Sequence, residues 1–108
     1  MAIRFEIQHR STTCSARLGI VHTPHRSFHT PAFMPVGTRA TVRGIFPGMV
    51  ARTGAEIILG NTYHLMLRPG AEVIQRLGGL QRFSGWAGPM LSGSGGYQAY
   101  SMAGINRI

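Results

Sequence analysis

The 108-residue sequence contains no aspartate and no lysine, and it has a single cysteine. The only acidic side chains are Glu6, Glu56 and Glu72, so catalysis that needs an aspartate cannot be completed within these residues, and no paired-carboxylate site is evident. The lone Cys14 excludes an internal disulfide and is typical of a reducing, cytoplasmic location.

Long apolar runs are missing as well. The longest span only a few residues, which predicts neither a membrane-spanning helix nor a membrane partner, and the N-terminus lacks the apolar core of a secretory signal. At this length we expect one small domain. A closed eight-unit α/β barrel takes roughly 250 residues, so this chain cannot form one alone.

The positive charge comes entirely from arginine. Eleven arginines against three glutamates give a formal net charge of +8, which favours a polyanionic partner such as RNA or DNA. The arginines are spread from Arg4 to Arg107 instead of forming one cluster. A GC-rich coding bias toward arginine, together with a loss of surface acids, therefore explains the charge equally well.

The first 40 residues predict a small antiparallel β unit. Residues 3–9 alternate apolar and polar side chains, a pattern typical of a strand. Pro35 would place a third strand at an edge of the sheet. Besides 3–9, strands are expected at 16–22 and 32–36, with turns at the Thr-Pro pairs 23–24 and 30–31.

Residues 41–108 predict the first βα units of an α/β fold. Proline opens and glycine closes two segments, as expected for helices, and short apolar runs between them are typical of strands buried on both faces. Strand, helix and strand at this spacing indicate a parallel βαβ unit. The helices are expected at 47–54 and 69–79, and the strands at 56–60 and 89–91.

Polar segments follow both predicted parallel strands, where α/β folds bind ligands. Asn61 and His64 come directly after the first strand, and Ser94, Gly95, Gly96 and Tyr97 come after the second. Glycines let the backbone approach a flat ligand, and Tyr97 is suited to stacking on a base. On local grounds alone, a tight βα turn explains the Ser-Gly-Gly sequence as well.

Six ordered and correctly spaced blocks carry a family resemblance: TPAFMPVGT (30–38), TGAEIILGNTYHL (53–65), LRPG (67–70), GGL (78–80), GW (85–86) and SGGYQ (94–98). Together they resemble the N-terminal part of the tRNA-guanine transglycosylase, or queuine tRNA-ribosyltransferase, family of the bacterial type. The resemblance extends over nearly all of this chain, the β unit before Thr30 included.

The resemblance implies an α/β architecture, the N-terminal portion of a (β/α)8 TIM barrel preceded by a small antiparallel β-sheet, with the barrel incomplete in this chain. It implies exchange of guanine at the wobble position of GUN-anticodon tRNAs for a 7-deazaguanine base, preQ1 in bacteria or queuine in eukaryotes. The implied partners are tRNA, that base and, for the full-length form, a second copy in a homodimer.

The family's mechanism is a double displacement that uses two aspartates. One attacks the ribose, and the other, in the motif Asp-Ser-Gly-Gly-Tyr/Phe-Gln, handles a proton during base exchange, much as two carboxylates serve retaining glycosidases. Gly93 stands at the position of this second aspartate. Losing a general acid/base costs about 10²–10⁴-fold in rate, so we expect this chain alone to be inactive.

The other family features are expected as follows. Ser94, Gly95, Gly96 and Tyr97 still match the base-binding loop, while Asn61 is expected in a supporting role near later carboxylates. The nucleophilic aspartate and a Cys₃His zinc site belong to family positions beyond Ile108. No metal or cofactor is expected in this segment.

Several alternatives stay open. His64 is either a general base or, more simply, a histidine that orients neighbouring loops. The chain is either part of an enzyme or a non-catalytic family member or remnant that binds tRNA or a partner subunit; an archaeal-type relative is a third interpretation. Zinc ligation or ordinary turn histidines would each explain the set Cys14, His22, His25 and His29.

Overall fold

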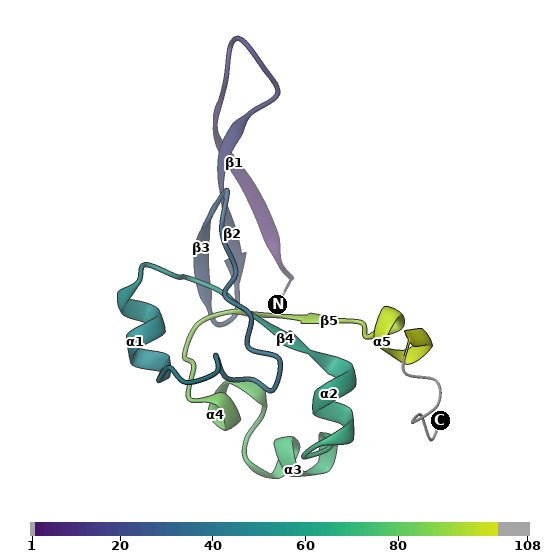
Figure 1. The fold of residues 1–108 in the computed structure, drawn as a ribbon. Coiled ribbons are helices and arrows are strands. Elements are labelled where there is room, and N and C mark those ends of the chain that lie inside the picture. Colours follow the sequence, from purple (N-terminus) through teal and green to yellow (C-terminus); the bar gives the residue numbers. More distant parts are fainter. Residues whose placement is uncertain (1, 102–108) are drawn as a thin grey trace.

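The structure is a computed structural model that describes residues 2–101. An antiparallel sheet projects from a larger α/β part, which contains the helices (Figure 1). The Cα radius of gyration is 16.0 Å, above the roughly 13 Å expected for a compact chain of this length, and the longest dimension is 51 Å. The sheet therefore has little of the molecule packed around it.

The antiparallel sheet consists of β1 (Arg4–Arg10), β2 (Arg17–Thr23) and β3 (Arg26–Thr30), in that order. The predicted first two strands are confirmed to within one residue. Gly19 of β2 lies beneath the Phe5 ring, because a Cβ at this glycine would stand 2.5 Å from a ring carbon. A glycine is thus needed where the aromatic ring crosses the neighbouring strand.

The expected third strand at 32–36 is wrong. The chain reverses immediately after β2, because the Thr23 hydroxyl accepts hydrogen bonds from the backbone N–H groups of His25 and Arg26 and donates one to the Arg26 carbonyl. This closes a tight hairpin, so β3 begins at Arg26. Of the predicted segment only Val36 is paired, in a parallel bridge to Leu59.

The α/β part contains two parallel strands, β4 (Ile58–Asn61) and β5 (Met90–Gly93). The predicted parallel βαβ unit is therefore confirmed. The eight-stranded barrel stays an expectation from the resemblance, because the parallel sheet within residues 2–101 contains two strands. The helices are α1 (Pro47–Arg52), α2 (Thr62–Leu67), α3 (Ala71–Arg76), α4 (Leu80–Ser84) and α5 (Gly96–Ser101).

The helices between β4 and β5 differ from expectation. The helix predicted at 69–79 is confirmed only as the shorter α3, because Gly78 and Gly79 both adopt positive φ angles, 91° and 99°. Helix α4, which begins after these glycines, was not predicted. Helix α2 was not predicted. It starts directly at the end of β4, where the Asn61 side-chain oxygen accepts a hydrogen bond from the backbone N–H of His64.

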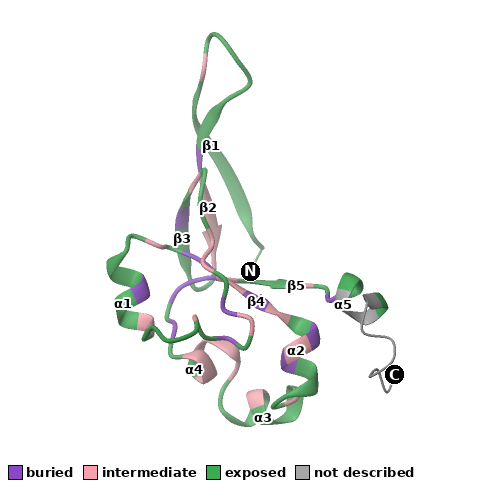
Figure 2. Cartoon of the chain, in the orientation of Figure 1, coloured by how far each residue is buried: buried purple, intermediate pink, exposed green. Residues whose placement is uncertain are grey.

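The core lies where α1 packs against the parallel strands. Val50, Ile58 and Trp86 form its buried cluster, with Met90 packed against them. The Trp86 indole N–H donates a 3.0 Å hydrogen bond to the Pro89 carbonyl, which satisfies the polar atom of this buried ring. Buried residues concentrate in β4, its flanking segments and the inner sides of α1 and α2 (Figure 2).

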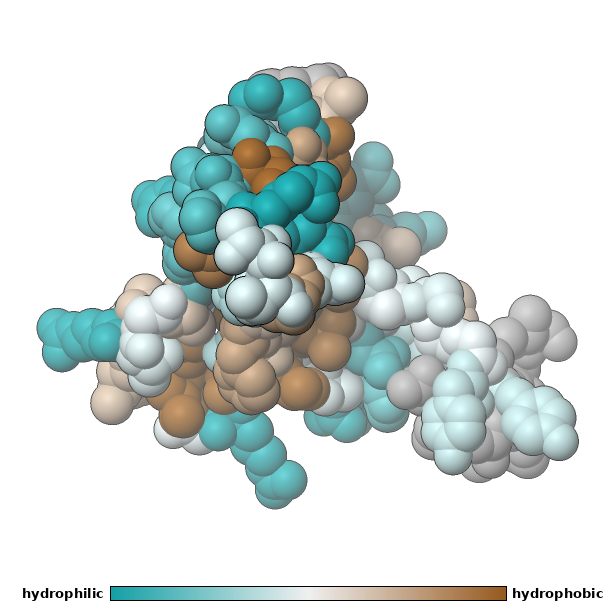
Figure 3. Space-filling model, turned by 90° about the horizontal axis from the view of Figure 1, so that it is seen from above, coloured by the Kyte–Doolittle hydropathy of each residue, from teal (hydrophilic) through white to brown (hydrophobic). Residues whose placement is uncertain are grey.

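Many large apolar side chains stay exposed. Figure 3 shows hydrophobic groups uncovered among hydrophilic ones, both on the projecting sheet and on the part beneath it. Phe5, Leu18, Phe46 and Leu91 are examples from both parts. Among the described residues no helix has the length and apolar character to span a membrane.

Candidate functional site

The carboxyl ends of β4 and β5 lie side by side. In the register of the parallel pair, Asn61 is the partner of Gly93, so the two polar segments singled out in the sequence meet at one edge. Helix α2 leaves this edge from β4, and α5 follows β5 (Figure 1). This edge is the candidate site, because ligands of parallel α/β folds bind beyond the carboxyl ends of strands.

Asn61 and His64 organise the β4 side of the edge. Besides capping α2, Asn61 donates its backbone N–H to the Thr38 carbonyl at 3.3 Å. The His64 ring lies edge-on to the Tyr63 ring, with centroids 5.7 Å apart. The Asn61 side chain therefore has a local structural task, and its expected support of later carboxylates stays a prediction.

Gly95 brings the loop after β5 against α2. It is buried, its φ is +76°, and a Cβ placed on it would stand 2.7 Å from the Cβ of Tyr63. The sequence suggested that this glycine admits a ligand. The structure adds a second reason for a glycine at this position, which is that the loop packs closely on α2.

The rest of the loop faces outward. The Ser94 hydroxyl accepts a 3.4 Å hydrogen bond from the backbone N–H of Gly96, which opens α5. The Tyr97 side chain is 76% exposed. A ring that stacks on an incoming base has to be exposed in this way before the base arrives. Gln98 belongs to the same motif, but its side chain lies outside the described residues.

Gly93 occupies a position with room for a side chain. A Cβ built there meets no atom within 4 Å, and the backbone is outside the left-handed region that favours glycine. Of the three glutamates, Glu6 and Glu56 hydrogen-bond to histidines of the antiparallel sheet, and Glu72 lies in the first turn of α3. The edge therefore has space for a carboxylate at residue 93 but has none there.

A basic cleft, which no sequence pattern predicted, borders the β4 side of this edge. Arg39 and Arg43 line it together with His64, and its volume is about 640 Å³. The spacing of four residues between the two arginines was the available signal. That spacing alone does not predict a cleft, because the path of the loop between β3 and α1 decides whether the two side chains lie together.

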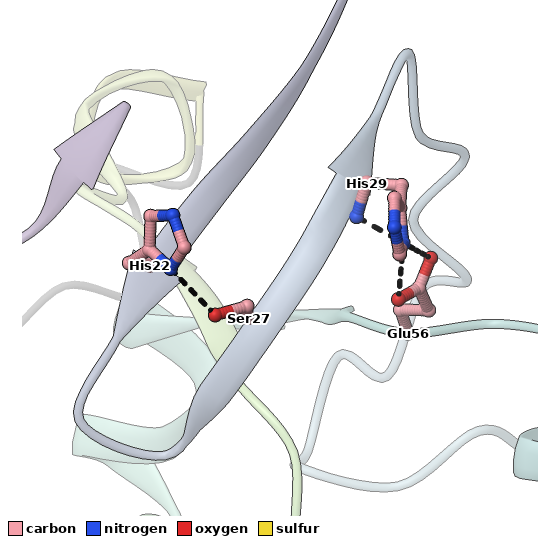
Figure 4. A network of polar contacts seen from close by, with 4 residues as sticks. All are labelled: His22, Ser27, His29 and Glu56. Atoms are coloured by element: carbon pink, nitrogen blue, oxygen red, sulfur yellow. Dashed lines mark hydrogen bonds and ion pairs between the residues drawn. The ribbon is translucent and has the colours of Figure 1, made fainter. Parts of the chain in front are cut away.

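The histidines of the N-terminal sheet form separate polar contacts (Figure 4). His22 contacts the Ser27 hydroxyl at 2.9 Å and a Glu6 carboxylate oxygen at 3.0 Å. His29 contacts both carboxylate oxygens of Glu56 at 3.1 Å. The second contact joins the projecting sheet to the segment that precedes β4.

The zinc alternative for Cys14, His22, His25 and His29 is wrong. Among residues 2–101 no three or more His, Cys, Asp or Glu side chains are grouped so that they could hold a metal ion. Cys14 is exposed, and hydrogen bonds from the Ser11 side chain and the Ala16 backbone lower the pKa of its thiol.

Comparisons with known proteins agree on one family. The family model described as queuine tRNA-ribosyltransferase matches residues 12–108. A protein of that name from Ruegeria pomeroyi is 54% identical over 108 residues, which is all of this chain and 29% of the relative. One from Lysinibacillus sphaericus is 52% identical over 107 residues, 99% of this chain and 28% of the relative. The chain thus spans less than a third of the length of these relatives.

Proposed function

Because the chain belongs to the queuine tRNA-ribosyltransferase family, we propose that it forms the N-terminal part of a tRNA-modifying transferase. In that protein, guanine at the wobble position of GUN-anticodon tRNAs is exchanged for a 7-deazaguanine base, preQ1 or queuine, by double displacement. The proposal includes a cytoplasmic location, homodimerisation of the full-length form and a zinc site formed by family positions outside this segment.

The loop after β5 is the proposed base-binding element. Support comes from its place at the carboxyl edge beside Asn61 and from the exposed ring of Tyr97. Packing of Gly95 on Tyr63 holds the loop in position. The target base has to leave its stack to reach any such pocket, and an aromatic face is a suitable surface to receive it.

Gly93 determines what this segment can contribute to the chemistry. An oxocarbenium-like centre needs a carboxylate nucleophile and a second acid/base group, and the chain contains no aspartate. Glycine can neither hold a proton nor orient the incoming base. The open space at residue 93 supports this proposal, because the backbone there leaves room for the Cβ of an aspartate.

A chimera tests this proposal. The matching 108 residues of the Ruegeria pomeroyi relative are replaced by this chain, once as it stands and once with Gly93→Asp, and incorporation of labelled guanine into tRNA is measured. We expect the unchanged chimera to exchange about 10²–10⁴-fold more slowly than the parent protein. Gly93→Asp should recover most of that loss. Parent-like exchange by the unchanged chimera contradicts the proposed role of residue 93.

A second function is favoured by the same missing carboxylate. A family member without catalytic groups would still bind tRNA or pair with a subunit, and the +8 charge is compatible with this. The discriminating result is salt-dependent tRNA binding with no base exchange, both in this chain and in the Gly93→Asp chimera. Recovery of exchange in that chimera rules out this second function for the scaffold.

A further inference from the structure

Ser27, His22 and Glu6 lie side by side on one face of the antiparallel sheet. In the strand register, Ser27 of β3 is directly opposite His22 of β2. Glu6 of β1 pairs with Ile20, two residues along β2 from His22. Residues two apart on a strand point to the same face, so the three side chains meet across the three strands. The strands of this sheet are separate from β4 and β5, whose ends form the candidate edge.

Two hydrogen bonds join these side chains into a relay. The Ser27 Oγ lies 2.9 Å from His22 Nδ1 (Figure 4), and a Glu6 carboxylate oxygen lies 3.0 Å from His22 Nε2. An ionised carboxylate only accepts hydrogen bonds, so in the neutral ring Nε2 carries the proton and Nδ1 accepts from the Ser27 hydroxyl. In this tautomer a histidine acts as a base towards a serine.

The surroundings of the relay hold the histidine and leave the serine accessible. Arg4, which is opposite His22 in the register, approaches the same Glu6 oxygen at 3.7 Å. The His22 side chain is 33% exposed, whereas Ser27 is classed among the exposed residues of β3. The ring is therefore fixed from both of its nitrogens, while a small molecule from solution can reach the hydroxyl.

Ser27 also lines a pocket, here called the hairpin pocket, which is formed by Arg26 and Ser27 of β3, by α1 and by residues 55–56 and 85–88. Its volume is about 370 Å³, at the small end of the range of roughly 300–1,000 Å³ for small-molecule sites. Glycine and alanine form most of its wall, and Trp86 adds an aromatic surface. These dimensions fit a short acyl group.

Arg26 gives the hairpin pocket a positive charge beside the serine. No ion pair within residues 2–101 involves Arg26. The acidic residue of the lining is Glu56, and His29 contacts both of its carboxylate oxygens at 3.1 Å. The guanidinium is thus available to an oxyanion that forms next to Ser27.

We propose that Ser27, His22 and Glu6 form a second site, which hydrolyses short-chain carboxylic esters with the acyl group in the hairpin pocket. A serine bonded to a base that a third group orients is the arrangement that activates a hydroxyl for acyl transfer. The proposal goes beyond the proposed function, because this site lies on a different sheet and needs neither tRNA nor residue 93.

The reaction consumes one ester and one water and yields one alcohol and one carboxylic acid. Ser27 Oγ bonds to the ester carbonyl carbon while its proton passes to His22 Nδ1. The bond from that carbon to the alcohol oxygen breaks, and Nδ1 returns the proton to the departing alcohol. Water then attacks the acyl group on Ser27 and gives a proton to Nδ1, which passes it to Oγ as the acid leaves. Glu6 is a positioning residue, since it acts through the ring.

The test uses the Ruegeria pomeroyi chimera that carries this chain. Every version includes Cys14→Ser, because the lowered pKa of the Cys14 thiol would let it attack activated esters as well. Hydrolysis of p-nitrophenyl acetate is followed by absorbance. Mass spectrometry locates the adduct of a fluorophosphonate, which transfers its phosphonyl group to an activated serine and releases fluoride.

The variants separate the roles within the relay. We expect Ser27→Ala and His22→Gln to lower kcat/KM for the ester by about 10²-fold or more. Glu6→Gln should lower kcat with KM unchanged, because an amide oxygen still accepts from Nε2 but no longer stabilises the charged ring. Ser11→Ala is the matched control, since the Ser11 hydroxyl contacts Thr13 and lies outside the relay. Circular dichroism compares the folds of all versions.

The adduct is measured with Ser27 in place, so this result does not depend on how the variants fold. A phosphonyl group on Ser27 that His22→Gln abolishes supports the proposal. An adduct confined to other residues overturns it, as do equal rates of ester hydrolysis for Ser27→Ala and Ser11→Ala. Neither measurement involves guanine exchange, so failure here leaves the proposed function to be judged by the Gly93→Asp chimera.

Discussion

Gly95 packs so closely against Tyr63 that a Cβ on the glycine would lie 2.7 Å from the tyrosine Cβ. One residue of the loop after β5 therefore fixes that loop against the first turn of α2. The contact joins the two halves of the candidate edge, which also meet at the pair Asn61 and Gly93. The Ser-Gly-Gly sequence thus has a structural requirement at its first glycine, beside any role in binding a base.

Gly95→Ala should destabilise the chain by about 1–3 kcal/mol, because the substitution combines a positive φ with steric overlap. The loss is measured as the difference in urea unfolding between the Ruegeria pomeroyi chimeras that carry the parent segment and the variant segment. Gly96→Ala is the matched control, since a Cβ there would meet only the Ser94 hydroxyl, at 3.7 Å. Equal stabilities of the two variants would refute the packing role of Gly95.

The sequence predicted the elements whose signals are local. The alternation at 3–9, the apolar run at 56–60 and the strand at 89–91 identified strands, and the spacing between the last two correctly indicated parallel pairing. The third antiparallel strand was missed because Thr23 closes a tight hairpin through its hydroxyl, a turn that hydrophobic patterning does not reveal.

The candidate site was predicted in part, for a similar reason. Strand order alone brought the segments at Asn61 and Gly93 to one edge, which the structure confirms. The basic cleft was missed because it depends on the loop that contains Arg39 and Arg43 being fastened to β4 by backbone hydrogen bonds. Such bonds carry no signature in side-chain chemistry.

Gly88→Ala should disturb the core around Trp86. A Cβ at residue 88 would lie 2.9 Å from the indole nitrogen that donates to the Pro89 carbonyl, so the ring has to shift or lose that bond. We expect a loss of about 1–3 kcal/mol and a red shift of fluorescence from the only tryptophan. Gly48→Ala, with nothing within 4 Å of its Cβ, should leave the emission unchanged.

Cys14 should react faster than an ordinary surface cysteine at neutral pH. Hydrogen bonds from the Ser11 side chain and the Ala16 backbone lower the pKa of its thiol, so the thiolate forms at lower pH. The rate of iodoacetamide alkylation against pH should therefore rise at lower pH in the folded chain than in urea. Ser11→Ala should move the folded curve back towards the urea curve; coinciding curves in the parent chain contradict the assignment.

The isolated 108-residue chain should unfold with low cooperativity. Its exposed apolar side chains include Phe46 at 78% and Leu91 at 48% exposure, and parallel β5 pairs with a single strand among the described residues. Uncovered apolar surface and strand edges favour association over a single packed state. Calorimetry and binding of a hydrophobic dye test this expectation, and a sharp monomeric transition without dye binding would count against it.

Gly93→Asp should alter activity without altering the fold. A Cβ at this residue meets no atom within 4 Å, so both Gly93→Asp and the isosteric Gly93→Asn should stay within about 0.5 kcal/mol of the parent chain in stability. In the chimera only the aspartate variant should recover guanine exchange, because an amide can neither accept nor return a proton. Its rate should fall as the pH drops towards about 4, where the carboxylate becomes protonated. Equal recovery by the asparagine variant would show that residue 93 acts through shape or hydrogen bonding and not through proton transfer.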